Sequence, residues 1–494
     1  MTELHSPEQA AGWLRDRVSG GLTTDSRQLK PGDGFIAWPG AAVDGRRFVV
    51  DALHAGALAC LVEAQNSARF ELSDPRVGFY SDLKGAAASI AAAYYEDPSR
   101  QLQTIAITGT NGKTSTAWWL AHALERLGRK CGVVGTLGVG VPSAMVFNGL
   151  TTPDPVLLQR ELRRFVNEGF SACAIEASSI GISEHRLDAI MIQVAVFTNF
   201  TQDHLDYHSS MERYWAAKES LFSWPGLKSA VLNIDDAKAA ELYARLEKAG
   251  LPVWSVSCGQ PARIQACVVE QGAQSMTVEF AEGQERHLVV LATIGLFNVS
   301  NVLCVVGALR ALGVSLADAV NACVDLPPVP GRLNILANSD GPLVVIDYAH
   351  TPDALEKVLT ALKPVAAKRS GQLWCVFGCG GNRDAAKRPL MGAAAQRYAD
   401  QIVVTSDNPR SENPDAIIQQ ISAGLAGAKS YYSQPDRAKA IAETLRQAGA
   451  KDVVLIAGKG HEDYQESHGV KVYFSDQSHA QTALQLRAAP PATS

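Results

Sequence analysis

Short apolar runs recur along the middle of the chain, and stretches with helical periodicity separate them. The runs are residues 104–108, CGVVG (131–135), ACAIEA (172–177), VAVFTN (194–199) and AVLNI (230–234). Strands that are buried on both faces form continuous apolar runs, and helices connect them in parallel sheets. The pattern therefore predicts a largely parallel, doubly wound sheet in this part of the chain.

The pattern then changes twice. Residues 252–290 contain four strand-like runs separated by turns (VWSVS, ACVVE, MTVEF and HLVVL), which predict an antiparallel extension. After the proline-rich segment PPVPG (327–331), the strand–helix rhythm returns in LVVID (343–347), LWCVFG (373–378), QIVVTSD (401–407) and DVVLIAG (452–458). This repeat predicts a second, Rossmann-like sheet, in which ligands bind beyond the carboxyl ends of the strands.

The first part of the chain has strand-like runs of its own. GFIAW (34–38) and ACLVEA (59–64) lie between helical stretches, and the helix-like segment AAASIAAAYY precedes residues 97–99. A chain of 494 residues is long enough for roughly two to four domains. We therefore predict three α/β domains: an N-terminal domain at 1–99, a central, mostly parallel domain at 100–331, and a C-terminal Rossmann-like domain at 332–494.

Composition narrows the class of protein. Apolar residues make up 47% and charged residues 19% of the chain, as in an ordinary protein with sizeable cores. The net charge of -5 argues against a nucleic-acid binder. The N-terminus MTELHSPEQAAGWL carries charges where a signal peptide is apolar, and no run of 18 apolar residues occurs. We expect a cytoplasmic protein without membrane insertion.

The cysteines indicate a reducing compartment. There are nine, an odd number, and no CxxC pair occurs. Cys375 and Cys379 lie four apart, but no further Cys or His pair is nearby. We therefore expect buried thiols, and neither a disulfide framework nor a structural zinc site.

The clearest chemical motif follows the apolar run 104–108. Glycines 109 and 112 flank Thr110 and Asn111, and Lys113-Thr114-Ser115 opens a helical pattern over 116–127. Glycines let backbone amides face a phosphate, and the helix N-terminus adds positive potential. A lysine at this place can reach the β- and γ-phosphates, and a threonine hydroxyl can ligate Mg²⁺. Only two residues separate the glycines, so a chance glycine-rich turn is the alternative.

Five segments together resemble the Mur ligase superfamily and its folylpolyglutamate synthase relatives. They are TGTNGKT (108–114), EASS (176–179), TNFTQDHLDYH (198–208), LFNVSN (296–301) and DYAHTPDALE (347–356). The resemblance covers almost the whole chain, in order. It implies acyl-phosphate chemistry with ATP and Mg²⁺, in which ATP phosphorylates a carboxylate and an amine then displaces phosphate.

The resemblance also implies an ATP site that spans the linker. Its predicted members are Gly109, Thr110, Asn111, Gly112, Lys113, Thr114, Ser115, Asn298, Asn301, Arg332 and Asp347. The two asparagines could equally serve helix capping and turns. Contacts from both sides of the linker imply domain closure, which would keep water away from the acyl phosphate. His350 and Lys387 are weaker candidates, for which structural roles are as plausible.

A metal site and a modified lysine follow from the same resemblance. The family places a second Mg²⁺ on the equivalents of Glu176 and His204, and carbamylates a lysine equivalent to Lys218 with CO₂. Lys113, Glu176, His204 and Lys218 are therefore the predicted catalytic residues. The predicted metal ligands are Thr114, Glu176, His204 and the carbamate of Lys218. The alternatives are a surface acid at Glu176, a helix-cap neighbour at His204 and a solvated helix lysine at Lys218.

The first region resembles the uridine-binding domain of the ligases that add the third and fourth peptide residues. The matching segments are TDSR (24–27), PGDGF (31–35) and DGRRF (44–48). The implied partner is UDP-N-acetylmuramoyl-L-Ala-D-Glu. Its predicted contacts are Thr24, Ser26, Thr151, Thr152, Ser178, Glu184 and Arg186, with Ser26 on the uracil side and Arg186 as an anion clamp or a solvated charge. Ile180, Glu184 and residues 41–42 depart from the family pattern.

The third region indicates the amino acid. DNPR (407–410) resembles the motif of family members that take meso-diaminopimelate, and GGNRD (380–384) and AGKGHE (457–462) match the rest of that pocket. A turn is the alternative for DNPR. The predicted pocket residues are Arg383, Asp407, Asn408, Pro409, Arg410, Gly458 and Glu462. Arg410 offers a planar fork to the distal carboxylate, and Glu462 would pair with the distal ammonium.

Other functions stay open at this point. A lysine-adding or D-Ala-D-Ala-adding family member shares the chemistry, but DNPR and the Gly-His-Glu segment argue against both. Folylpolyglutamate synthase lacks a uridine-type N-terminal domain. A non-catalytic nucleotide-binding protein would bind ATP without turnover, and the set Lys113, Thr114, Glu176, His204 and Lys218 argues against it. We expect a monomer.

Overall fold

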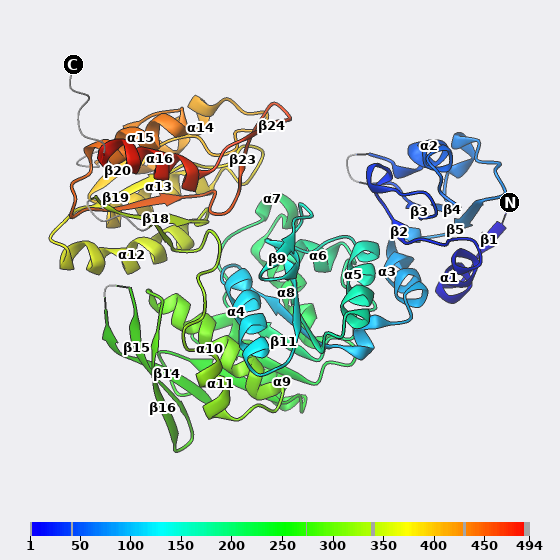
Figure 1. Cartoon of the computed structure of the whole chain (residues 1–494), viewed down its shortest axis with the longest axis horizontal. Helices are drawn as coiled ribbons and strands as arrows, with labels where there is room; N and C mark the ends of the chain where they lie inside the picture. Colours follow the sequence, from blue (N-terminus) through cyan, green and yellow to red (C-terminus); the bar gives the residue numbers. More distant parts are fainter. Residues whose placement is uncertain (1, 41–42, 273, 337–340, 428–430, 489–494) are drawn as a thin grey trace.

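The computed structural model describes residues 2–40, 43–272, 274–336, 341–427 and 431–488. Residues 41–42, which depart from the family pattern, lie outside this set. Three α/β regions follow one another along the chain, each built on its own sheet (Figure 1). The predicted fold class is confirmed, whereas the domain limits at 99 and 331 stay predictions.

The N-terminal sheet has five strands in the order β1-β5-β4-β3-β2, and all of its neighbouring strands are parallel. Its strands are β1 (Thr2–Leu4), β2 (Leu22–Thr23), β3 (Gly34–Ala37), β4 (Ala59–Glu63) and β5 (Val77–Tyr80). The helices are α1 (Pro7–Arg15), α2 (Val49–His54) and α3 (Leu83–Tyr94). Helix α3 packs against α5 (Pro155–Asn167) of the central region, which joins the two regions.

The central sheet has eleven strands, and its middle is parallel from β14 to β7. The strands are β6 (Gln103–Thr108), β7 (Cys131–Gly135), β8 (Gly138–Val141), β9 (Ala144–Val146), β10 (Ala172–Glu176), β11 (Val194–Phe197), β12 (Ser229–Asn233), β13 (Val253–Ser257), β14 (Ile264–Gln271), β15 (Met276–Glu282) and β16 (Glu285–Leu291). Antiparallel strands border both edges, β8 and β9 on one side and β15 and β16 on the other.

The predicted antiparallel extension over 252–290 is wrong for its first part. β13 pairs in parallel with β12 and β14, and only the pairs β14–β15 and β15–β16 are antiparallel. Helix α9 (Ala237–Lys248) connects β12 to β13 and brings the chain back, so that both strands run in the same direction. VWSVS lacks the continuous apolar pattern of the other parallel strands, whereas the helical crossover through α9 makes β13 parallel to β12.

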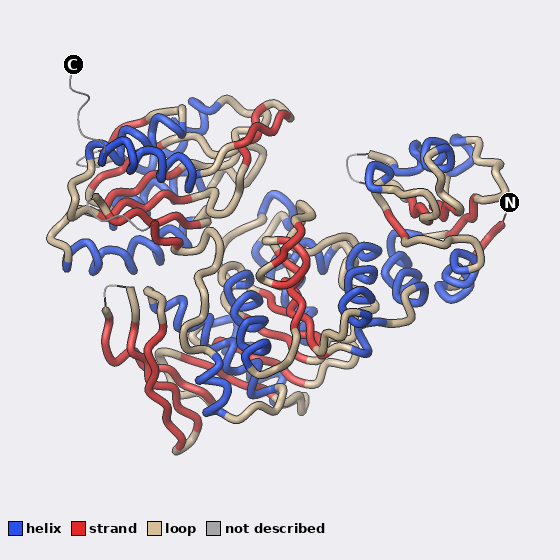
Figure 2. Tube along the Cα trace, in the orientation of Figure 1, coloured by secondary structure: helices blue, strands red, loops and turns tan. Residues whose placement is uncertain are grey.

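Helices surround the central strands (Figure 2). Besides α5 and α9 they are α4 (Lys113–Arg126), α6 (Ser179–Ser183), α7 (Leu205–His208), α8 (Met211–Glu219), α10 (Leu296–Ala311) and α11 (Leu316–Ala322). Helix α4 begins three residues before the predicted helical pattern, directly after the glycine-rich loop. Apolar side chains form separate cores on the two faces of the sheet, as expected for strands buried on both sides.

The C-terminal sheet has the order β17-β18-β22-β19-β20-β21 and is parallel except at β17. Its strands are β17 (Asn334–Leu336), β18 (Leu343–Asp347), β19 (Leu373–Phe377), β20 (Gln401–Val404), β21 (Tyr431–Ser433) and β22 (Val453–Ala457), followed by the hairpin β23 (Tyr464–Ser467) and β24 (Val470–Tyr473). The helices are α12 (Pro352–Lys368), α13 (Lys387–Tyr398), α14 (Pro414–Ser422), α15 (Arg437–Gln447) and α16 (Asp476–Ala488).

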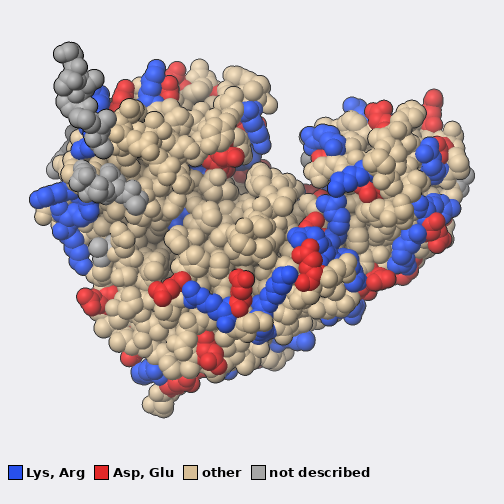
Figure 3. Space-filling model, viewed as in Figure 1, with Lys and Arg blue, Asp and Glu red and all other residues tan. Residues whose placement is uncertain are grey.

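The N-terminal and C-terminal regions lie on opposite sides of a broad notch above the central region (Figure 3). Charges of both signs are interspersed over the face in view, in keeping with the small net charge of -5. No helix among the described residues is long and apolar enough to cross a membrane. Among the described residues the cysteines are free thiols; Cys375 and Cys379 are buried, as predicted, whereas Cys258 is partly exposed and Cys267 is exposed.

Candidate functional site

The glycine-rich loop connects β6 to α4 and is held by the end of the neighbouring strand β11. Asn199, just after β11, accepts the backbone N–H of Thr110 at 2.8 Å and, through its side-chain oxygen, that of Asn111 at 2.9 Å. Asn199 Nδ2 in turn donates to the Asn111 carbonyl at 3.0 Å. These contacts fix the loop backbone through the N–H and the carbonyl of Asn111, so its side chain is available for another hydrogen bond.

Helix α4 begins at this loop with an open N-terminus. Its N-cap is Gly112, at φ +87°, and no side chain caps the first turn. A Cβ at position 112 would lie 2.3 Å from Asn301 Oδ1, so only glycine fits between the loop and α10. The uncapped N–H groups of a long helix form a site suited to an anion.

Two lysines share the carbonyl oxygen of Gly109. Lys113 Nζ donates to it at 2.9 Å and also to the Thr110 carbonyl at 2.9 Å, and Lys218 Nζ donates to it at 2.8 Å. Lys218 is only 1% exposed and lies 4.6 Å from the Tyr214 ring, so it is not the solvated helix lysine of the alternative interpretation. Burial lowers the pKa of both lysines, and the charge of Lys113 lowers that of Lys218 further.

Glu176 stands at the end of β10 and joins the loop to its surroundings. It is 1% exposed, which excludes a surface role. Its carboxylate accepts the Thr114 hydroxyl at 2.9 Å and the backbone N–H of Thr136 at 2.8 Å. Thr114 also accepts a hydrogen bond of 3.2 Å from Arg332, across the linker. The predicted metal ligands Thr114 and Glu176 therefore meet, together with the predicted ATP contact Arg332.

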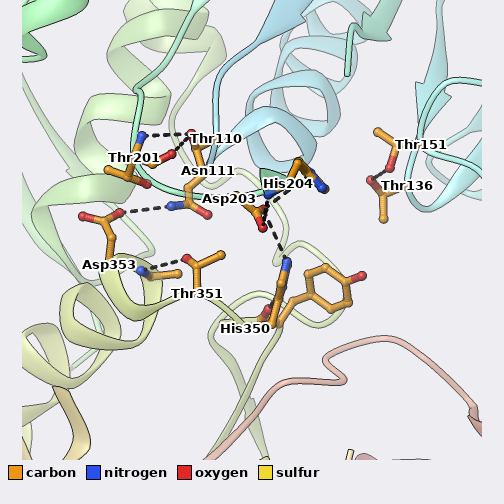
Figure 4. Close-up of polar contacts among 12 residues, drawn as sticks. Thr110, Asn111, Thr136, Thr151, Thr201, Asp203, His204, His350, Thr351 and Asp353 are labelled. Carbon is orange, nitrogen blue, oxygen red and sulfur yellow. Dashed lines mark hydrogen bonds and ion pairs between the residues drawn. The ribbon is translucent and has the colours of Figure 1, made fainter. Parts of the chain in front are cut away.

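Asp203 is a member of the site that the sequence did not single out, although it precedes His204. Its carboxylate accepts the backbone N–H of His204 at 2.9 Å and lies 3.4 Å from His204 Nε2 and 3.9 Å from His350 Nε2 (Figure 4). Asp203 is buried, whereas the two imidazoles are partly exposed. One carboxylate thus links a residue before α7 with a residue before α12.

A second contact across the linker was also missed by sequence reasoning. Asn111 Nδ2 of the loop donates to Asp353 Oδ2 in the first turn of α12, at 3.0 Å (Figure 4). Lys357, one turn further along α12, binds the same carboxylate oxygen at 2.9 Å. Asp353 lies within the segment 347–356, but its sequence context alone resembles an ordinary helix start.

All of the predicted ATP residues except Gly109 line a cavity of about 180 Å³ between the central and C-terminal regions. Asp347 is buried at its wall, accepts the backbone N–H groups of Leu333 and Ala349, and has a pKa raised by burial and opposed by the charge of Arg332. The predicted residues on the wall are Thr110, Asn111, Gly112, Lys113, Thr114, Ser115, Asn298, Asn301, Arg332 and Asp347. A larger cavity of about 980 Å³ adjoins it at Asn199, Asn301 and Lys357.

A further cavity of about 360 Å³ holds most of the predicted substrate residues. Its walls include Thr151, Ser178 and Arg186 from the central region and Arg383, Asp407, Asn408, Arg410, Gly458 and Glu462 from the C-terminal region. Thr136, Thr151, Asp203, His204, Tyr348 and His350 line both this cavity and the one at the phosphate loop. The two cavities therefore meet at a shared wall.

The remaining predicted residues stand apart from this cavity. Thr152 is fully buried behind it, where its hydroxyl binds the Glu176 carbonyl at 2.7 Å and its own carbonyl accepts Arg186 at 2.9 Å. Pro409 shapes the turn, and its carbonyl accepts the Glu412 N–H. Glu184 pairs with Lys84 of the N-terminal region at 2.6 Å.

Thr24 and Ser26 are not brought to the cavity, which residues before Thr136 do not line. Ser26 begins a short 3₁₀ helix and is half-buried. Burial raises the pKa of Asp154, and the side chain of Thr24 is among the hydrogen-bond donors that oppose this shift. The broad notch of Figure 3 separates the N-terminal region from the C-terminal one.

Comparisons with known proteins find relatives along almost the whole chain. Three family models match: the Mur ligase middle domain over 107–309, the Mur ligase glutamate ligase domain over 331–460, and the Mur ligase family catalytic domain over 19–95. A relative from an Acidovorax species, named UDP-N-acetylmuramoyl-L-alanyl-D-glutamate--2,6-diaminopimelate ligase, is 56% identical, and the alignment covers 99% of each chain.

Solved structures give the same result at lower identity. A structure with the same ligase name is 34% identical, with a TM-score of 0.63 and 95% of each chain covered. MurF from Acinetobacter baumannii, at 20% identity, shares the fold with a TM-score of 0.69 over 98% of each chain.

The Asn111–Asp353 contact leads to a prediction about nucleotide binding. Asn111→Ala should weaken binding of an ATP analogue by up to about tenfold, because a hydrogen bond to a charged group contributes about 1.5 kcal/mol. Isothermal titration calorimetry measures this. Asn321→Ala, which alters an exposed asparagine of α11, is the control. Equal affinities for the two variants would mean that the contact does not support the nucleotide site.

Proposed function

Because this chain belongs to the Mur ligase family, we propose that it joins meso-2,6-diaminopimelate to UDP-N-acetylmuramoyl-L-alanyl-D-glutamate at the expense of ATP. The product would be a precursor of peptidoglycan. One observation carries the proposal: the phosphate-loop cavity and the cavity of Arg410 and Glu462 share a wall at Thr151, His204 and His350. A phosphorylated carboxylate at that wall would be open to an amine from the other side.

The reaction has two steps. A substrate carboxylate oxygen attacks the γ-phosphorus of ATP, and ADP leaves. The amine nitrogen of diaminopimelate then attacks the acyl carbon, phosphate leaves, and the amine releases a proton. Lys113, the open N-terminus of α4 and Arg332 surround the place of the phosphates, where fixed positive groups stabilise the charge that develops during phosphoryl transfer.

The residues at Glu176 fit Mg²⁺ in their chemistry. Within the described residues no group of three or more His, Cys, Asp or Glu side chains could hold a metal. Mg²⁺ usually binds through one or two protein oxygens together with phosphates and waters, and the Thr114 hydroxyl and the Glu176 carboxylate are such oxygens. When bound, Mg²⁺ would neutralise phosphate charge, and His204, on the wall of the same cavity, would be a further residue to hold it.

Residues on both sides of the linker would keep water out. Arg332 reaches Thr114 and Asp353 reaches Asn111, so the C-terminal region touches the phosphate loop at two points. An acyl phosphate hydrolyses readily, and closing the gap between the regions would protect it. ATP supply favours the cytoplasm as the place of the reaction.

Lys218 is proposed to carry a carbamate. A neutral amine nitrogen bonds to the carbon of CO₂ and releases a proton, so that the side chain, a cation when protonated, becomes an anion. Burial beside Lys113 lowers the pKa of Lys218 and so favours the neutral amine that this step needs. The resulting carboxylate-like oxygens would lie behind the loop and offset the charge of Lys113.

The acceptor preference tests the function. Phosphate release with ATP, Mg²⁺ and UDP-N-acetylmuramoyl-L-Ala-D-Glu should occur with meso-diaminopimelate and be lower by at least about a hundredfold in kcat/KM with L-lysine, because a buried polar pocket rejects a ligand that leaves its groups unpaired. D-Ala-D-Ala should give no turnover. Turnover with lysine at the same rate would contradict the proposed specificity, and silence with all three would contradict the ligase assignment.

Arg410→Lys tests the pocket. In the wild type the guanidinium donates to the Gly381 carbonyl at 2.8 Å, and its Nε lies 3.6 Å from Glu466. Lysine keeps the charge but cannot bind a carboxylate with two parallel hydrogen bonds, so KM for diaminopimelate should rise roughly tenfold to a hundredfold. KM for ATP should stay unchanged in the same steady-state assay. Equal loss for both ligands would remove Arg410 from the amino-acid site.

Carbamylation is tested directly by labelling. Protein equilibrated with ¹³C-bicarbonate should give a carbamate carbon signal by NMR, and depletion of CO₂ should lower kcat. Lys218→Met should lack the signal, whereas Lys113→Met should keep it. A signal that persists in Lys218→Met would locate the modification at another lysine.

A further inference from the structure

Lys459 is a buried cation that none of the proposed roles uses. It follows Gly458 at the end of β22, and its side chain is completely buried. Gly458 has φ +116°, and a Cβ there would lie 2.6 Å from Asp407 Oδ2. The chain therefore turns closely under Asp407, which directs the Lys459 side chain behind the wall of the amino-acid cavity.

The Lys459 ammonium contacts three of the residues that form this wall. Its Nζ donates to Asn408 Oδ1 at 3.0 Å and to Glu462 Oε2 at 3.2 Å, and lies 3.8 Å from Asp407 Oδ1. Asp407, Asn408 and Glu462 all line the cavity of about 360 Å³. One ammonium thus supports three side chains that face the ligand.

Lys459 sets the direction of the Asn408 carboxamide. An ammonium only donates hydrogen bonds, so the carboxamide oxygen must face it. The backbone N–H of Glu466 donates to the same oxygen at 3.0 Å. The amide nitrogen of Asn408 is then directed at Glu462 Oε2, 2.9 Å away.

Glu462 is fixed in consequence. Its Oε2 accepts hydrogen bonds from both Asn408 and Lys459, and the Tyr348 hydroxyl lies 3.4 Å from its Oε1. A carboxylate in such a half-buried place needs a positive partner, because an unpaired buried charge is costly. Lys459 supplies that partner before an amino acid arrives, for both Glu462 and Asp407.

We infer that Lys459 is a positioning residue that orients Asn408 and Glu462 and sets the charge of the amino-acid pocket, so that it favours a ligand without net charge over a cationic one. The inference rests on the proposed function. Diaminopimelate carries two carboxylates and two ammonium groups, whereas lysine carries a net positive charge. Because the ammonium of Lys459 lies beside Glu462, a bound lysine gains less attraction from that carboxylate. The distal carboxylate of diaminopimelate still binds Arg410.

The test is Lys459→Met in the full-length protein, with ATP, the UDP-muramoyl dipeptide and either diaminopimelate or L-lysine. KM for diaminopimelate should rise roughly tenfold or more, because charged hydrogen bonds to Asn408 and Glu462 are lost. KM for ATP should change by less than about twofold. The ratio of kcat/KM for diaminopimelate over lysine should fall, since removal of a cation favours a cationic ligand.

Lys471→Met is the matched control. Lys471 is exposed on β24 and lies 4.2 Å from the Tyr464 ring, which Lys459 approaches at 5.4 Å from the buried side. This control should leave KM for diaminopimelate, for L-lysine and for ATP unchanged, and it should also keep the selectivity ratio. If it changed selectivity as much as Lys459→Met does, a general charge effect would replace the inference.

Lys459→Gln serves if the methionine variant does not fold. It keeps a hydrogen-bond donor and loses the charge, so the selectivity ratio should fall while KM for diaminopimelate rises less. An unchanged selectivity ratio in a folded variant would overturn the inference and leave the proposed function intact. An equal rise in KM for ATP, for the UDP-muramoyl dipeptide and for the amino acid would do the same. A wild-type protein without turnover on diaminopimelate would overturn the proposed function and the inference together.

Discussion

Two parallel sheets present the carboxyl ends of their strands to the same gap, and the site depends on that constraint. β6, β10 and β11 of the central sheet end at the phosphate loop, at Glu176 and just before Asn199, whereas β18 and β22 of the C-terminal sheet end at Asp347 and just before Gly458. Loops at these ends carry the polar chemistry of such folds. Neither sheet holds a complete site, and the Arg332–Thr114 and Asn111–Asp353 contacts keep the two halves together.

Buried cations determine the charge of the gap between the two sheets. Lys113 and Lys218 converge on one carbonyl oxygen, and Lys459 lies fully buried behind the amino-acid cavity. A buried ammonium is stable only with anions or polar groups around it. At the phosphate loop burial lowers the pKa values of both lysines, and the nearby carboxylates offset this only in part. In the amino-acid pocket Asp407 and Glu462 supply negative charge beside Lys459. The need of a buried ammonium for anionic partners therefore favours phosphate at the phosphate loop. In the amino-acid pocket it favours a network of balanced charges.

Local patterns in the sequence predicted what local structure determines. CGVVG forms β7 at the expected residues, and the glycine-rich loop opens α4 because glycine, lysine and threonine act over a single turn. Contacts between segments far apart in the sequence could not be predicted from local patterns. The parallel pairing of β13, the burial of Lys218 and the roles of Asp203, Asp353 and Lys459 all depend on packing between elements far apart in sequence. The relation of Ser26 to the cavity depends on how whole regions are arranged, which no local pattern encodes.

In the proposed reaction a carboxylate is phosphorylated at the shared wall of the two cavities before the amine attacks. Transfer of an isotope label tests it most directly. With ¹⁸O in the substrate carboxylate, we expect the released phosphate to carry one labelled oxygen, because the acyl carbon–oxygen bond breaks when the amine attacks. Phosphate without label, with both heavy oxygens kept in the peptide substrate or lost to water, would contradict an acyl-phosphate intermediate.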